Sequence, residues 1–372
     1  MSIDSSSRKP RRTLVIFGII AMLLILPGCR LVYLFKVATS EFELLNGAIP
    51  IDDALKSDSL GENLKAHLSL VKKAKRFGET ELGLKETANY STVNLDPNQG
   101  RFYALSAAYK DRLAPVTWWF PVIGNLPYIG FFDLESARAE QRKLIEMDLD
   151  TVLGRVDAYS TLGWFKDPLT LSLIESSTVD LVETVLHEMT HSTLYLKGQG
   201  EFNEGLATLV GKQGSYLFMK ETFGPDHPLT LEAQKSIEEE RVFSSFLIPL
   251  LKELNQVYDS SLAYQEKLRE REKIFALALE RLRSLGSRSE TPRFARLAQG
   301  PLNNAVLVSL AVYHGHYPLF ERALKQSGDS IPKMLGTLRT ISREGENMMV
   351  SMRAWLDKNE ASSSPITIRL LF

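Results

Sequence analysis

The run His187-Glu188-Met189-Thr190-His191 constrains the fold more than any other feature of the sequence. Residues four apart on an α-helix lie on one face with their Cβ atoms about 5–6 Å apart, so both imidazoles can reach one metal ion. A helix is predicted over 177–196, and Ser177 with Asp180 fits a capping box at its start. The pattern therefore predicts a helix that presents two histidines to a metal.

A third ligand is expected from a second helix, predicted over 202–223. Gly198 and Gly200 break the chain between the two helices, so the second can return antiparallel to the first. On the second helix, Glu204 shares its face with small residues only, which lets the two helices lie close together. These are Ala207, Thr208, Gly211 and Ser215. Because a catalytic zinc takes three protein ligands and keeps one open position, we expect Zn²⁺ at His187, His191 and Glu204.

Glu188 follows the first histidine by one residue, which turns its side chain about 100° around the helix. From there its carboxylate can touch a water on the metal without binding the metal itself. Zinc lowers the pKa of such a water to about 7, so a carboxylate can take its proton. The motif predicts Glu188 as the catalytic base of a hydrolase acting on a peptide substrate. The alternative is two ordinary helix histidines beside a surface glutamate.

The first 28 residues are typical of a targeting signal. Basic residues precede an apolar run over 13–26, which is short for a spanning helix of about 20 residues and suits a secretory signal. The run ends at Leu26-Pro27-Gly28-Cys29, which resembles a bacterial lipobox with Cys29 as the lipidated residue. The alternative is an uncleaved signal anchor. Both interpretations place the body outside the cytoplasm, and Arg30 favours an outer-membrane lipoprotein facing the periplasm over inner-membrane anchoring.

Composition excludes some partners. The formal net charge is −1, so no basic excess exists to bind nucleic acid. The single cysteine excludes an intramolecular disulfide. Charged blocks at 72–76 and 238–241 predict solvated helix faces. No low-complexity linker divides the chain, and residues 29–372 are expected to form one domain.

The predicted fold class is mainly α (α+β), with a zincin-like core and a small sheet ahead of the metal helix. Helices are expected over 60–77 and 133–149, and a long helical hairpin forms an arm at about 231–285. The segment 101–109 fits either a strand or a helix. A short strand is expected within 155–167, where an extended substrate could pair with the backbone. The substrate-binding residues proposed there are Tyr159, Ser160, Thr161, Leu162 and Gly163; the alternative is a purely structural strand.

Other parts of the site are less constrained. Tyr313 is the first candidate for a catalytic donor to the tetrahedral oxyanion, and His314 and His316 are the others. The alternatives are a core tyrosine and two surface histidines. An aminopeptidase must also bind a free α-ammonium group, and Glu183, Asp157 and Glu201 remain open as its partner.

Several stretches besides the histidine motif resemble the bacterial family named "Putative aminopeptidase", a group of zinc-peptidase-like lipoproteins. They are Trp118-Trp119-Phe120-Pro121 through Pro127-Tyr128, Glu135-Ser136-Ala137, Ala158 to Phe165 with Asp167-Pro168, Phe202-Asn203-Glu204, Leu302-Asn303-Asn304-Ala305 and Tyr313. The resemblance covers nearly the whole chain after the signal. It implies a gluzincin-like site at His187, Glu188, His191 and Glu204, and aminopeptidase activity.

The chain departs from the family pattern at two places. Met189-Thr190 stands where the family commonly has Leu-Ala, and Gly205 stands where serine is common. Neither change alters a ligand. Two other functions compete with the peptidase: a catalytically silent envelope lipoprotein whose arm binds a partner, and a zinc amidase acting on cell-wall peptides. The intact ligand set and Glu188 argue against the first, while the second differs only in substrate.

Overall fold

The computed structural model describes residues 43–97, 102–120, 124–156, 167–288, 292–342 and 346–363. Most of these residues are helical and the strands form only small sheets, which confirms the mainly α class. The predicted signal and Cys29 lie outside the described residues. Within the described part, no helix has both the length and the apolar character that crossing a membrane requires.

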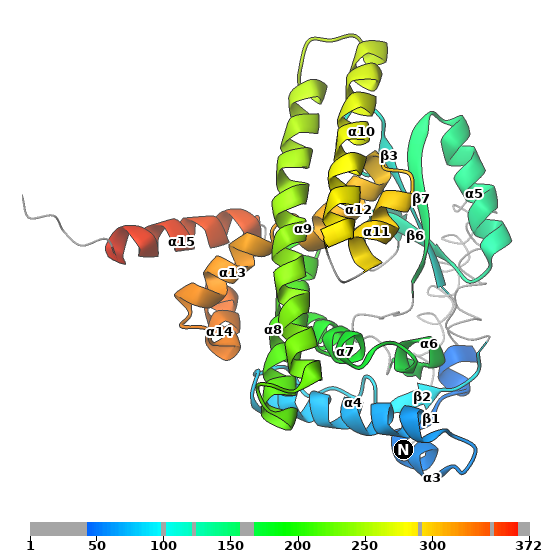
Figure 1. The fold of residues 1–372 in the computed structure, drawn as a ribbon, viewed down its shortest axis with the longest axis vertical. Coiled ribbons are helices and arrows are strands. Elements are labelled where there is room, and N and C mark those ends of the chain that lie inside the picture. The colour runs from blue at the N-terminus through cyan, green and yellow to red at the C-terminus, as the bar shows by residue number, and fades with distance from the viewer. Residues whose placement is uncertain are drawn as a thin grey trace, which may run out of the picture.

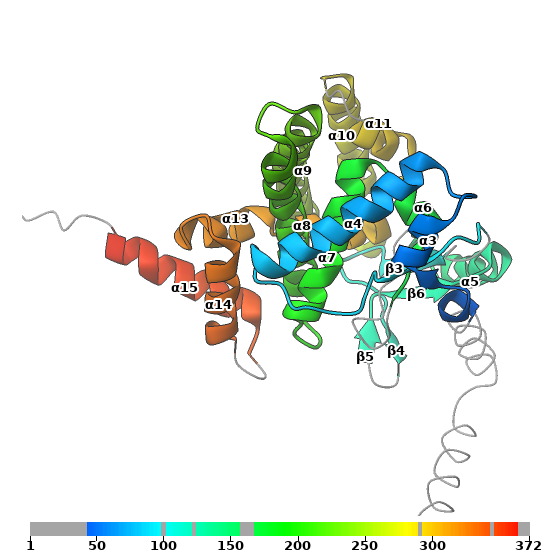
Figure 2. The same ribbon diagram turned by 90° about the horizontal axis from the view of Figure 1, so that it is seen from below.

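The layer that carries the metal motif is built from three long helices. These are α4 (Glu62–Thr80), α7 (Thr178–Thr193) and α8 (Gly200–Phe223). Helices α7 and α8 pack along each other, and α4 crosses them on one side (Figure 2). Beside them lie α3 (Ile51–Lys56), α6 (Leu171–Ile174) and a small sheet in the order β1 (Ile49–Pro50), β2 (Thr92–Asn94), β8 (Leu169–Thr170).

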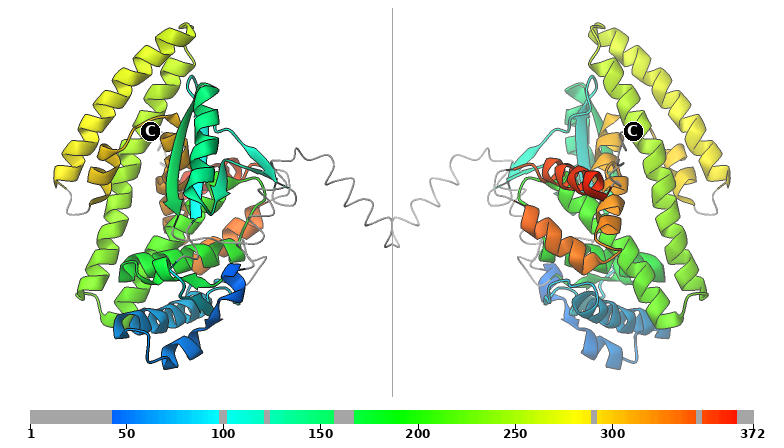
Figure 3. Two further views of the ribbon diagram at one scale, coloured as in Figure 1. Left: turned by 90° about the vertical axis from the view of Figure 1, so that its right-hand side faces the viewer. Right: turned by 90° about the vertical axis from the view of Figure 1, so that its left-hand side faces the viewer.

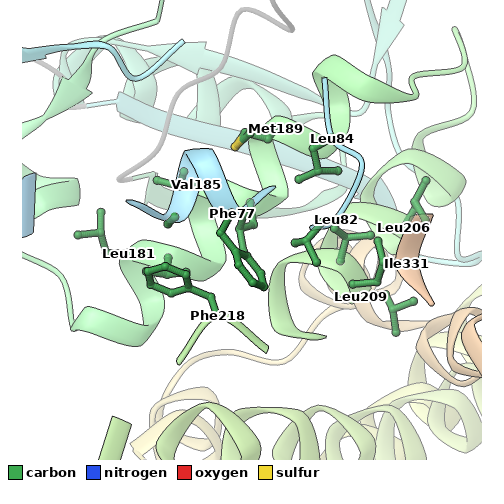
Figure 4. Packing of buried hydrophobic residues seen from close by; sticks show 14 of the residues in the cluster. Phe77, Leu82, Leu84, Leu181, Val185, Met189, Leu206, Leu209, Phe218 and Ile331 are labelled. Atoms are coloured by element: carbon green, nitrogen blue, oxygen red, sulfur yellow. The ribbon is translucent and has the colours of Figure 1, made fainter. Parts of the chain in front are cut away.

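The buried cluster between these helices is apolar. In Figure 4, Phe77 of α4 and Phe218 of α8 lie beside Val185 and Leu181 of α7, and the two phenylalanine rings meet edge to face at 5.5 Å. Val185 and Leu181 are fully buried. Burying an aliphatic or phenyl side chain contributes about 1.5–3 kcal/mol. The metal helix is therefore held from both sides by packing that is independent of any metal.

A second sheet lies ahead of the metal helix in the chain. Its order is β6 (Tyr128–Phe131), β3 (Phe102–Tyr109), β7 (Leu149–Val156), and both pairings are antiparallel. Helix α5 (Leu134–Glu146) packs against it, and β4 (Trp118–Phe120) and β5 (Gly124–Leu126) form a separate hairpin. Of the segment 101–109, residues 102–109 are therefore a strand, because they supply the centre of this sheet. The predicted substrate strand, Tyr159 to Gly163 included, lies outside the described residues.

The predicted arm is confirmed as the hairpin of α9 (Pro228–Tyr258) and α10 (Tyr264–Arg288). The two helices meet at their connecting turn, diverge away from it and project from the body (Figures 1 and 3). They pack with α11 (Pro292–Gln299) and α12 (Asn304–His314) around a separate apolar cluster that includes Phe243, Leu254 and Leu282. Three further helices, α13 (Tyr317–Gln326), α14 (Ile331–Ile341) and α15 (Met348–Ser363), complete the body.

Candidate active site

Three side chains converge between α7 and α8. The Nε2 atoms of His187 and His191 are 3.2 Å apart. The Oε2 atom of Glu204 lies 3.2 Å from Nε2 of His187 and 3.3 Å from Nε2 of His191. The three atoms thus form a nearly equilateral triangle.

This triangle has the dimensions of a zinc site. With zinc–ligand distances near 2.0–2.1 Å and tetrahedral angles, ligand atoms lie about 3.3–3.4 Å from one another. The two imidazoles also turn the same nitrogen toward each other, an arrangement that a shared cation explains better than a hydrogen bond between two rings. The donor set of two imidazoles and one carboxylate is one that zinc accepts. His187, His191 and Glu204 therefore fit the ion that the sequence predicts.

Burial and mutual contact shift the titration of two of these groups. Burial alone would raise the pKa of Glu204, but hydrogen bonds and charge at His187 and His191 hold that pKa far below its ordinary value. Burial alone would lower the pKa of His191, but the hydrogen bond to Glu204 and the charges of Glu204 and Glu188 outweigh it and raise that pKa. Glu204 is thus a carboxylate at neutral pH.

Glu188 lies beside the two histidines of the triangle. A carboxylate oxygen of Glu188 and one ring nitrogen each of His187 and His191 lie within 4.8 Å of one another. Its Oε2 atom is buried and has no hydrogen-bond partner among the described residues. This oxygen is close enough to both histidines to reach a water bound between them, and the role of Glu188 as a base rather than a ligand stays a prediction.

Local structure explains how the ligands meet. Ser177 begins α7 as predicted, because its hydroxyl accepts a hydrogen bond from the Asp180 amide at 3.1 Å. Asn203 closes the turn between the helices, since its side-chain amide exchanges two hydrogen bonds with the backbone of Leu196, at 2.9 and 2.8 Å. Sequence reasoning assigned Asn203 no role of its own, although it stands directly before the ligand Glu204.

The predicted stripe of small residues does bring α8 against α7. A Cβ atom on Gly211 would lie 2.8 Å from the backbone oxygen of Glu183 and 3.3 Å from Cβ of His187. Only glycine fits there without moving one helix. Close approach of the helices is what lets the short side chain of Glu204 reach both histidines.

Tyr313 lies at the site rather than in the core. Its ring is stacked on His187 at a centroid distance of 6.3 Å, and the residue is 38% exposed. Desolvation and then the charges of Glu204, Tyr128 and Glu188 raise its pKa well above the ordinary value. The phenol therefore keeps its proton and can act as a donor. Tyr195 is a second tyrosine at the site, edge-on to His191 at 6.2 Å. No motif in the sequence singles it out.

The alternative of a surface histidine is wrong for His314. Its side chain is only 16% exposed, and Nδ1 lies 2.7 Å from Oε1 of Glu240. The prediction of a solvated face at 238–241 is wrong at Glu240 as well, because that residue is 0% exposed. Helical periodicity turns one residue of any such block inward, and which one depends on the neighbouring helices.

Of the three candidates for binding an α-ammonium group, the two that the structure describes differ in their exposure to solvent. The carboxylate of Glu183 is bound by Lys212, with Nζ 3.1 Å from Oε2, and is largely buried. Asp157 lies outside the described residues. Glu201 stands one turn before Glu204, its side chain is 59% exposed, and it pairs with His316 at 3.1 Å. Among the described candidates, Glu201 is therefore the carboxylate that an incoming ligand can reach.

Comparisons with known proteins agree with the motifs. No curated protein and no solved structure matches the chain. One family model matches residues 32–348, which include both metal-motif helices, the arm and Tyr313. On the extent of that match, the chain belongs to the family described as "Putative aminopeptidase".

Proposed function

We propose that this protein is a zinc-dependent peptidase, and within that class an aminopeptidase, that works in the bacterial cell envelope. The observation that carries the proposal is the triangle of ligand atoms from His187, His191 and Glu204, with sides of 3.2–3.3 Å. Membership of an aminopeptidase family supports peptide substrates.

The roles of the protein's own groups follow from their positions. A zinc ion held by His187, His191 and Glu204 would polarise the scissile carbonyl and acidify the attacking water. Glu188 takes the proton from that water as its oxygen bonds to the carbonyl carbon, and passes the proton to the leaving amine as the C–N bond breaks. The protonated phenol of Tyr313 donates a hydrogen bond to the oxygen on which negative charge develops.

The location of the protein rests on its amino terminus. We propose that Cys29 is lipidated and that the body faces the periplasm at the outer membrane. Mass spectrometry of the amino-terminal peptide from the purified protein tests this. A diacylglyceryl group on Cys29 is expected, and an intact signal sequence would instead favour the uncleaved signal anchor.

The first test compares the full chain with its Glu188→Gln variant. Both should contain about one zinc per chain, because Glu188 is not a ligand. Only the wild type should cleave a mixed peptide library, because loss of the general base lowers the rate by about 10²–10⁴-fold. The ends of the products, read by mass spectrometry, distinguish an aminopeptidase from an endopeptidase.

Two outcomes would redirect the proposal. A wild type that binds no zinc would contradict the metal site and favour the silent scaffold. A wild type that binds zinc but leaves every peptide intact would favour the amidase, which the same assay on isolated cell-wall peptides would then detect.

A further inference from the structure

A buried network of charged residues lies behind the metal site. Lys212 of α8 donates to Oε2 of Glu183 at 3.1 Å and to Oγ of Ser236 at 2.7 Å. The same ammonium group is 3.9 Å from Oε2 of Glu240, whose other oxygen meets His314 at 2.7 Å. We call Lys212, Glu183, Glu240 and His314 the Lys212 network. Its members come from α8, α7, α9 and α12.

Burying such a network costs free energy, so a contribution to stability does not by itself explain it. Removing carboxylates from water is strongly unfavourable unless each finds its partners in good geometry, and apolar residues often replace such groups without loss. Glu240 is 0% exposed and Lys212 is 9% exposed. A buried network of this kind does, however, fix where its four helices stand relative to one another.

The helix whose orientation depends most on this network is α12, whose last residue is His314. Besides the contact with Glu240, the backbone oxygen of His314 accepts a hydrogen bond from Ser244 at 3.0 Å. Its ring also stands edge-on against Phe243, with centroids 5.1 Å apart. The imidazole and the backbone of His314 are thus both held by α9. This fixes the rotation of the last turn of α12.

The rotation of this last turn sets the direction of the Tyr313 side chain. Successive side chains point about 100° apart around a helix, so a His314 held toward α9 leaves Tyr313 directed elsewhere. Its ring lies over His187 of α7, at 6.3 Å and with the two planes 25° apart. A twist of the last turn would move the phenol away from the three ligand atoms.

We propose that His314, held by Glu240 within the Lys212 network, is a positioning residue that places the Tyr313 hydroxyl at the zinc site. This inference rests on the proposed function for its catalytic meaning, because Tyr313 matters there as the donor to the oxyanion. A donor must stay within about 0.5 Å of its productive position to be effective. His314 acts only through Tyr313 and touches no substrate.

The structural part of the inference can be tested without any activity. Labelling the twelve tyrosines with ¹³C at Cζ gives one signal each, and the Tyr313→Phe variant identifies the signal of Tyr313. In the zinc-free full chain, His314→Phe keeps a ring but loses the donor to Glu240. It should shift or broaden the Tyr313 signal. His314→Asn retains a donor near the position of Nδ1 and should return the signal toward its wild-type position.

A matched control comes from another histidine. His227 accepts a hydrogen bond from the Leu229 amide at the start of α9 and belongs to neither the metal site nor the Lys212 network. The His227→Phe variant should leave the Tyr313 signal in place. Thermal unfolding of each variant shows whether a change in the signal comes from a folded protein.

The catalytic part is a double-mutant cycle with the zinc-loaded enzyme. His314→Phe should lower kcat by about tenfold with little change in KM, since displacement of a catalytic group slows the chemical step. In the Tyr313→Phe background the same substitution should have almost no further effect. An equal loss in both backgrounds would overturn the inference, because His314 would then act by a route other than Tyr313.

The proposed function and the positioning role of His314 can fail independently of each other. If the wild type cleaves no peptide but His314→Phe moves the Tyr313 signal, the proposed function fails and the positioning stands. If the wild type is active and a folded His314→Phe changes neither the signal nor kcat, the positioning fails and the peptidase stands.

Discussion

At the scale of single residues, opposite charges balance at short range in the candidate metal site. Glu204 is drawn into its anionic form by two imidazoles, and His191 is drawn toward its protonated form by Glu204. Without a metal, protonated His191 therefore supplies part of the positive charge that a bound cation would place beside Glu204. Zinc must displace that proton in order to bind.

Zinc affinity should consequently fall as the pH falls. The pKa of His191 is raised, so this imidazole keeps its proton to a higher pH than an ordinary histidine. Zinc binds only the neutral ring, so affinity is full above the raised pKa and is lost progressively below it, by about tenfold per pH unit for one displaced proton. Competition with a chelator across this range measures the effect. An affinity that does not change with pH would contradict it.

Glu201 should set the preference for free amino termini. The hydrogen bond to His316 lowers its pKa, so it is negatively charged at neutral pH. Glu201→Gln should raise KM for peptides with a free amino terminus by about two- to fivefold, the loss of one exposed ion pair with a ligand. Hydrolysis of the matching N-acetylated peptides serves as the control. Equal effects on both substrates would remove Glu201 as the ammonium partner.

At the scale of elements, the site depends on how close two helices lie. The contact of Gly211 with Glu183 and His187 sets the distance between α7 and α8, and hence the reach of Glu204. Helix α12 is the third element of the site and is held at both ends. At its start the Asn304 amide donates to Asp150 at 3.0 Å, and at its end His314 contacts Glu240.

Adding one methyl group at this contact should weaken the metal site. In Gly211→Ala, the new Cβ would lie 2.8 Å from a backbone oxygen, so the helices must separate. We expect a loss of about 1–3 kcal/mol in the free energy of unfolding and weaker zinc binding, as for other overpacked cores. Urea unfolding and zinc titration measure the two effects.

Gly336 provides the control for that substitution. It also lies inside a helix, α14, but a Cβ atom there would meet nothing within 4 Å. Gly336→Ala should therefore stabilise the protein by up to about 1 kcal/mol, the ordinary difference in helix propensity. If both variants behaved alike, the close contact of α7 and α8 would have no special role.

At the scale of the whole molecule, three apolar clusters share the body. One surrounds the metal helices, one fills the arm and one lies under the sheet of β3. The arm is joined to the sheet by a buried ion pair, in which Arg271 of α10 binds both oxygens of Asp150 of β7, at 2.8 and 3.2 Å. Asp150 also accepts from the start of α12. One carboxylate thus connects arm, sheet and active-site helix.

Breaking this pair should destabilise the protein strongly. Both side chains are more than nine-tenths buried, so Arg271→Met leaves the charge of Asp150 without its main partner. The expected loss is about 3–5 kcal/mol in the free energy of unfolding. Arg269→Met, on the same helix but with a side chain 67% exposed, should change stability by less than about 0.5 kcal/mol. A similar small change in both variants, measured by urea unfolding, would contradict the role of the pair.

The sequence by itself determined the parts of this protein that depend on local periodicity. The spacing of His187 and His191, the cap at Ser177 and the small residues before and after Gly211 predicted two close helices and three ligands. The structure brings these three together. The hairpin over 231–285 was predicted for the same reason, because residues a few positions apart decide whether a helix forms.

Only the tertiary structure decided which polar residues are buried together. Glu240 and His314 are far apart in the chain and are residue types usually found on surfaces, yet the packing of α9 against α12 brings their side chains together. The strand over 102–109 likewise became certain only because β6 and β7 flank it. Local patterns cannot show such partners, because burial is a property of the surfaces that meet when distant elements pack.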